Sequence, residues 1–172
     1  MSPIATHSIL VLVISPAEAN YHGVCHLIID MLAPIGPVLL VDDDQLFYQA
    51  VLCEVAPHHQ LVVLTNVQAA ITYLEQAPVA PFLIICASNL RSMTGLPLRA
   101  HIDTDRSLRK LAIPFVFITH PVYEQPVEKA YELTIQGLLE KQPDVASTRQ
   151  QLQSVIAYWS AYLHPNRFSD EG

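Results

Sequence analysis

Short, unbroken runs of aliphatic residues recur along the chain from residue 37 onward, and amphipathic stretches separate them. A run without polar alternation is typical of a strand buried on both faces, as in the middle of a parallel sheet. The pattern predicts five strands, at residues 37–41, 61–64, 82–86, 114–119 and 138–139.

Segments with apolar residues every three or four positions follow these strands, and this is the period of a helix with one buried face. Thr65 or Asn66 is expected to cap the second helix. Ser147 and Gln150 predict a capping box at the start of the last helix. The predicted helices cover residues 47–55, 67–74, 97–111 with a break near 103–105, 126–133 and 147–163.

Continuous apolar strands joined by helices predict an α/β domain, in which a parallel sheet carries helices on both faces. No internal repeat, low-complexity segment or linker divides residues 37–163, so this range is interpreted as one domain. Residues 164–172 are expected to form a C-terminal tail.

Residues 1–36 are interpreted as an N-terminal extension of unclear role. Its apolar run at residues 9–14 is too short to span a bilayer. A signal peptide requires basic residues before its apolar run, and no Lys or Arg precedes this one. Met31 lies just before the first strand of the domain, which fits an upstream-extended start. Metal-type ligands occur at residues 22–26, but no second cluster at suitable spacing completes a site.

Composition and charge narrow the classes of function. Hydrophobic residues make up 51% of the chain and charged residues 15%, which excludes general disorder. The formal net charge of -7 argues against nucleic acid as a partner. The three cysteines include no CxxC pair, which indicates reduced thiols in a cytoplasmic protein.

The first strand of the domain runs directly into three carboxylates, those of Asp42, Asp43 and Asp44. They are expected at the carboxyl edge of the sheet, where open α/β folds keep their sites. Adjacent like charges raise one another's pKa unless a cation or a basic side chain offsets them. Because an acidic cluster in a loop is often only solvated, the residues further along the chain decide what this one does.

Three segments, in this order, resemble the signatures of a response-regulator receiver domain of the single-domain type, in the CheY-like superfamily. They are residues 38–44, residues 113–119 and the pair Glu140-Lys141. Residues 156–159 resemble the final helix of single-domain receivers found beside bacterial histidine kinases and phytochromes. The resemblance covers residues 37–163 and implies a flavodoxin-like (βα)5 doubly wound parallel sheet with the strand order 2-1-3-4-5.

The resemblance also implies roles for four residues at the carboxyl edge of this sheet. Asp42 and Asp43 match the acids that bind Mg²⁺ in receivers. Thr119 matches the hydroxyl residue that senses the phosphoryl group, and Lys141 matches the lysine that pairs with the phosphoryl oxygens.

Two positions depart from the receiver pattern. The phosphoacceptor position, counted back from Gly95, is Ala87, and a methyl group has no lone pair with which to attack a phosphoryl group. Because one metal ligand is lost with the acid, weak or lost Mg²⁺ binding at Asp42 and Asp43 is expected, with no other cofactor. The position of the aromatic switch residue is Leu138. These departures predict a pseudo-receiver without enzymatic activity.

The retained residues also have plainer explanations. Lys141 could neutralise Asp42 and Asp43 without any metal. Thr119 could serve only to satisfy backbone groups at a strand end. Trp159 is better explained by core packing than by an interaction site.

Three functions remain after these considerations. The first is a two-component (phosphorelay) signalling protein, which binds a histidine kinase or another signalling protein without being phosphorylated. The second is a receiver that is phosphorylated at an atypical residue, and the third is a non-signalling flavodoxin-like enzyme or nucleotide binder. The third is weakest, because the chain has no glycine-rich phosphate loop. The first function is favoured. It is expected to involve neither nucleic acid nor a membrane as a partner, and it is compatible with a homodimer.

Overall fold

The computed structural model describes residues 36–43, 45–90, 93–120, 132 and 134–162. The expectations for residues 1–35, for Asp44, for the helix after Pro126 and for the tail at 164–172 lie outside these described residues.

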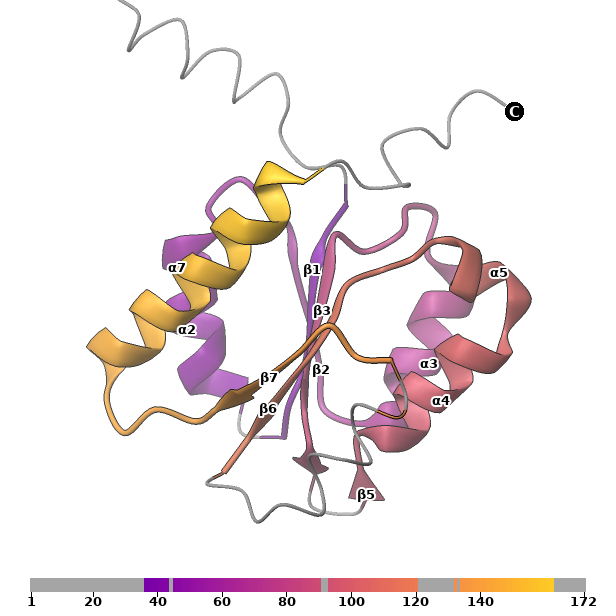
Figure 1. The fold of residues 1–172 in the computed structure, drawn as a ribbon, viewed down its shortest axis with the longest axis horizontal. Coiled ribbons are helices and arrows are strands. Elements are labelled where there is room, and N and C mark those ends of the chain that lie inside the picture. The colour runs from indigo at the N-terminus through magenta and orange to yellow at the C-terminus, as the bar shows by residue number, and fades with distance from the viewer. Residues whose placement is uncertain (1–35, 44, 91–92, 121–131, 133, 163–172) are drawn as a thin grey trace, which may run out of the picture. The chain divides into compact units, whose positions relative to one another are not determined.

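A five-stranded parallel sheet forms the centre of the described fold, in the order β2-β1-β3-β6-β7 (Figure 1). Counted along the chain, these strands stand in the order 2-1-3-4-5, so the predicted fold class and strand order are confirmed. The strands are β1 (Val38–Val41), β2 (Leu61–Leu64), β3 (Leu83–Ala87), β6 (Phe115–Thr119) and β7 (Gly137–Glu140).

A small antiparallel hairpin follows β3, in a stretch that the sequence predicts only as loop. It consists of β4 (Asn89–Leu90) and β5 (Met93–Thr94), and it leads into the next helix. The backbone N–H of Gly95 donates to the carbonyl of Ser88 at 3.0 Å, which closes the loop over the end of β3.

Helices cover both faces of the sheet (Figure 1). One face carries α2 (Gln45–Val55) and α7 (Val145–Ala161), and the other carries α3 (Val67–Gln76), α4 (Leu96–Thr104) and α5 (Arg106–Lys110). The predicted break near residues 103–105 is confirmed, because Asp105 ends α4 and caps α5. Its carboxylate accepts from the backbone N–H groups of Ser107 and Leu108.

Two hydrophobic cores lie on the two faces of the sheet, and β1 contributes to both. Val38 and Leu40 pack into the core on the α2 and α7 side, whereas Leu39 and Val41 pack into the core on the side of α3, α4 and α5. All four side chains are buried. Alternate residues of a strand point to opposite faces, so a strand that is covered on both sides must be apolar throughout.

The start of the last helix differs from the prediction. Asp144, and not Ser147, is the N-cap of α7, and its carboxylate accepts from the backbone N–H of Ser147 at 2.8 Å. The Ser147 hydroxyl donates to the same carboxylate at 2.8 Å. Aspartate caps a helix as well as serine does, so the helix begins further upstream than the capping box implied. At α3, Asn66 is the cap, as predicted.

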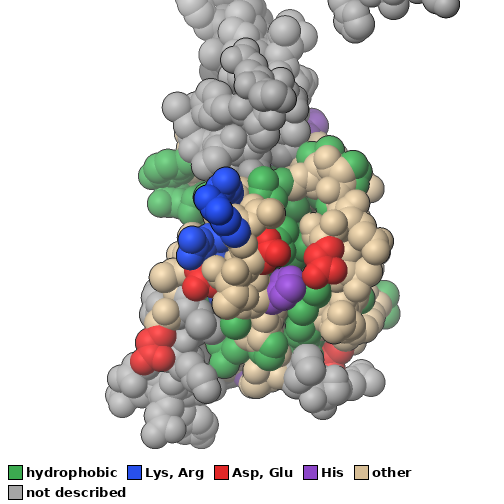
Figure 2. Space-filling model, turned by 90° about the vertical axis from the view of Figure 1, so that its right-hand side faces the viewer, with side chains coloured by type: hydrophobic (Ala, Val, Ile, Leu, Met, Phe, Trp, Pro, Cys, Tyr) green, Lys and Arg blue, Asp and Glu red, His purple; other side chains and the backbone are tan. Residues whose placement is uncertain are grey.

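The helical face formed by α3, α4 and α5 carries charges of both signs close together (Figure 2). Arg106, Arg109 and Lys110 are exposed on α5. On the neighbouring helices, Nε2 of His101 lies 3.4 Å from a carboxylate oxygen of Glu75.

Among the residues described, no helix is long and apolar enough to cross a bilayer.

Candidate functional site

The parallel register brings four of the residues singled out in the sequence to the same edge of the sheet. Asp42 directly follows β1 and Ala87 is the last residue of β3, and these two strands pair in register up to that point. Thr119 is the last residue of β6, and Lys141 directly follows β7. The backbone N–H of Lys141 donates to the carbonyl of Thr119 at 2.7 Å, so the edge is continuous across the sheet.

A buried ion pair occupies this edge. Nζ of Lys141 lies 3.6 Å from Oδ2 of Asp42, whose side chain is 1% exposed, while that of Lys141 is 18% exposed. The same ammonium group lies 5.4 Å from the ring centroid of Tyr48, within the range of a cation–π contact. Lys141 therefore neutralises Asp42 directly. The sequence left this role open for Lys141, beside the role of pairing with phosphoryl oxygens. Asp43 is half-buried next to this pair.

Ala87 contributes a methyl group to the edge and is 2% exposed. The loop that follows is tightly packed against it, because a Cβ at Gly95 would lie 2.6 Å from the carbonyl oxygen of Ala87 and 2.7 Å from Sγ of Cys86. Only glycine allows this close approach of the loop to the end of β3. Ser88 is the next residue along the chain, and neighbouring residues of a strand point to opposite faces.

Comparison with known proteins identifies the fold and its class. No family model matches the chain. Response regulator Rcp1 of Synechocystis sp. is 29% identical over 135 residues, which are 73% of this chain and 90% of that protein. The crystal structure of Mn²⁺-bound Rcp1 matches with a TM-score of 0.66 and 26% identity, over 76% of this chain and 99% of that one. In sequence and in fold, this chain is similar to response-regulator receiver domains.

A second solved structure supports the fold of this receiver. The phosphorylated cyanobacterial phytochrome response regulator RcpA matches with a TM-score of 0.67 and 22% identity, over 76% of this chain and 98% of that chain. At this identity the match shows the fold alone. Receiver domains of this class belong to two-component signalling, interact with kinases or other signalling proteins, and are generally not enzymes.

Two acids at this edge of the sheet are described, and one of them already has a basic partner. Of the adjacent acids, Asp42 is already paired with Lys141, and the third strand ends in the methyl group of Ala87. In the part of the chain that the structure describes, no three His, Cys, Asp or Glu side chains gather closely enough to hold a metal ion. Mg²⁺ requires a near-octahedral set of oxygens. Asp42 and Asp43 could supply only part of that set, and waters would have to supply the rest.

Two further residues that the sequence singled out, Thr119 and Leu138, lie on β6 and β7. Thr119 is buried at the end of β6. Leu138 is half-buried and packs against the core on the side of α3, α4 and α5. His120, the residue after Thr119, is exposed. Leu138 thus contributes an aliphatic side chain to this core.

Two residues at the edge were not expected there from the sequence. Tyr48 in the first turn of α2 faces Lys141, and its only sequence signal is that it follows the acids by less than two helical turns. The Cys86 thiol is buried beneath the site, and burial, with a smaller effect of the Asp42 charge, raises its pKa. The thiol therefore stays protonated and does not serve as a substitute nucleophile.

Proposed function

We propose that this receiver has lost phosphorylation at its acceptor position and acts in two-component signalling as a protein-interaction module that does not require phosphorylation. The observation that carries the proposal is the buried methyl group of Ala87 beside Asp42. A carboxylate oxygen is the nucleophile in receiver phosphorylation, and alanine has no atom that could replace it.

The charge balance at the edge of the sheet supports the proposal. An acid at position 87 would place three carboxylates near one lysine, and such an excess of negative charge needs a cation. With alanine there, Asp42 and Asp43 share the positive charge of Lys141, which already contacts Asp42 at 3.6 Å. We therefore expect weak Mg²⁺ binding. We also expect that Lys141 is already paired with Asp42 and is not available to a phosphoryl group.

The absence of an aromatic switch residue points the same way. A receiver that responds to phosphorylation must redistribute between two conformations. Leu138 contributes to a packed core in place of a ring that could swing toward Thr119. We infer that the domain holds one conformation and signals through its abundance, or through the accessibility of its partner surface.

The partner class follows from the receiver fold. A histidine kinase or another two-component signalling protein is the expected partner, and a homodimer is compatible with the same role. The chain has only three cysteines and no CxxC pair, and this pattern favours a cytoplasmic location. Nucleic acid and membrane surfaces are disfavoured by the net charge of -7.

A phosphoryl mimic tests this function. Full-length protein with Mg²⁺ and beryllium trifluoride, which binds carboxylates in the manner of a phosphoryl group, is followed by its amide NMR spectrum. We expect no change in the wild type, and shifts around Thr119 and Lys141 in the Ala87→Asp variant. Ala87→Asn is the matched control, because it has nearly the same shape without the charge.

The wild-type spectrum decides the outcome. Shifts around Thr119 and Lys141 in the wild type, of the size seen in Ala87→Asp, would contradict the proposal. They would favour a receiver that uses an atypical acceptor such as Ser88.

A further inference from the structure

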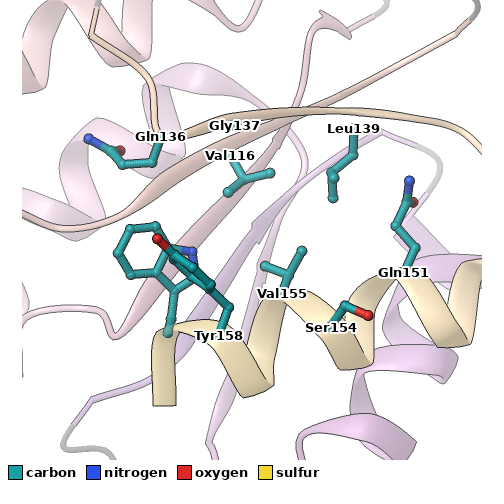
Figure 3. A pocket seen from close by; sticks show the side chains of 9 residues that line it. Val116, Gln136, Gly137, Leu139, Gln151, Ser154, Val155 and Tyr158 are labelled. Atoms are coloured by element: carbon teal, nitrogen blue, oxygen red, sulfur yellow. The ribbon is translucent and has the colours of Figure 1, made fainter. Parts of the chain in front are cut away.

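A groove runs between the strand β7 and the helix α7, on the face of the sheet that α2 also covers (Figure 3). Its volume is about 650 Å³, which is in the range of ligand-binding pockets. Val116 and Leu139 from the sheet and Val155 from α7 supply its aliphatic lining. The groove is separate from the acidic edge, because none of Asp42, Ala87 or the other edge residues lines it.

Gly137 keeps this groove open. A Cβ at this position would meet only the methyl groups of Val116, at 3.8 and 3.9 Å, which is ordinary van der Waals contact. Its backbone is not in the left-handed region. Neither packing nor conformation therefore demands glycine here, although glycine weakens a strand. A glycine inside a strand often marks a place where a ligand or another chain approaches closely.

Aromatic side chains of α7 form one end of the groove. Tyr158 and Trp159 both line it, with ring centroids 5.0 Å apart in an edge-to-face arrangement. Tyr162 lies next to Tyr158, with centroids 4.5 Å apart. Tyr158 and Tyr162 are 52% and 50% exposed, so a ring surface large enough for a partner remains uncovered within the described structure.

The polar groups of the groove are all neutral. Gln136, Gln151 and Ser154 line it, and no charged side chain does. A charged ligand would lose its hydration there without gaining a counter-charge. At the end of β7, the carbonyl of Glu140 already accepts from the side-chain amides of Gln142 and Gln151, at 3.0 and 3.2 Å, so a further strand could not use that acceptor.

We propose that this groove binds an uncharged, proline-rich peptide segment of a partner protein. A polyproline II helix makes no internal hydrogen bonds, so its rings pack on aromatic faces while its carbonyls accept from neutral side-chain donors. Tyr158 and Trp159 supply such faces. The side-chain amides of Gln136 and Gln151 donate one N–H to the carbonyls of Thr134 and Glu140, and the second N–H of each amide supplies such a donor. The inference rests on the proposed interaction role and specifies the kind of segment that is recognised.

The chain contains its own reporter for this test, because Trp159 is its single tryptophan. Titration of the full-length protein with a short oligoproline peptide is expected to change the fluorescence of Trp159 in a saturable way. Gly137→Val fills the groove and Tyr158→Ala removes a ring, and each should weaken binding about tenfold or more. Both variants should unfold at nearly the wild-type temperature. Leu46→Ala is the control, since Leu46 is 77% exposed on α2 and does not line the groove.

Three results would overturn this inference. One is the absence of a saturable response up to about 1 mM peptide. Another is binding that survives both Gly137→Val and Tyr158→Ala. The third is a fluorescence change that follows protein concentration without peptide, which would show that a second copy covers the groove. None of these results alters the response of Ala87→Asp to the phosphoryl mimic, so failure here is distinguishable from failure of the proposed function.

Discussion

The side chain of Lys141 meets two partners, the carboxylate of Asp42 and the ring face of Tyr48. The first contact was predictable, because both residues follow strands that a parallel sheet brings to one edge. The second was not, because nothing in the helical period marks Tyr48 as a partner of the lysine. Contacts between elements that are distant in sequence leave no local pattern. Ala87 ends β3, which is the place in the sheet that counting back from Gly95 predicted for it. Its match to the phosphoacceptor position stays a prediction.

Replacing Lys141 by methionine tests the ion pair. The buried carboxylate of Asp42 would lose its counter-charge, so the free energy of unfolding is expected to fall by on the order of 3 kcal/mol. Urea denaturation measures this loss, and the double variant Lys141→Met with Asp42→Asn should recover much of it. The control is Arg149→Met, which breaks the exposed pair with Glu54 and should cost far less. Equal losses for Lys141→Met and Arg149→Met would rule out a buried pair.

At the scale of elements, the strands that the sequence predicted best are those with continuous apolar runs. The bounds of β1, β3 and β6 differ from the prediction by at most one residue at either end. β7, at Gly137–Glu140, likewise extends one residue beyond its predicted core of 138–139 at each end. Glycine and glutamate carry no strand signal of their own, and they take strand geometry here because they pair with β6.

The start of α7 gives a prediction at the same scale. Asp144 holds the backbone N–H and the hydroxyl of Ser147, and these hydrogen bonds lower the pKa of its carboxyl group. Asp144→Ala is therefore expected to lower the thermal unfolding temperature, whereas Gln150→Ala should leave it nearly unchanged. Circular dichroism measures both unfolding temperatures. If Gln150→Ala lowers the temperature more than Asp144→Ala does, the capping box predicted from the sequence would be the better description.

At the scale of the whole molecule, the sequence was sufficient for the architecture and for the gathering of the site residues. Both follow from apolar strands alternating with helices, since parallel strands all end at one edge. The groove could not be predicted from the sequence, because it depends on how α7 packs against β7. Trp159 illustrates the limit, since it packs against the core, as expected, and also lines the groove. The division into an extension at 1–36, a receiver at 37–163 and a tail at 164–172 stays a prediction.

The central claim is that this receiver does not accept a phosphoryl group, and phosphorylation by a small donor tests it most directly. Full-length wild type and Ala87→Asp are incubated with acetyl phosphate and Mg²⁺, and the mass of the intact protein is measured. Because Thr119 and Lys141 are still at the edge of the sheet, Ala87→Asp is expected to gain one phosphoryl group that hydroxylamine removes, as an acyl phosphate requires. The wild type is expected to gain none. A wild type that is phosphorylated as fully as Ala87→Asp would contradict the account.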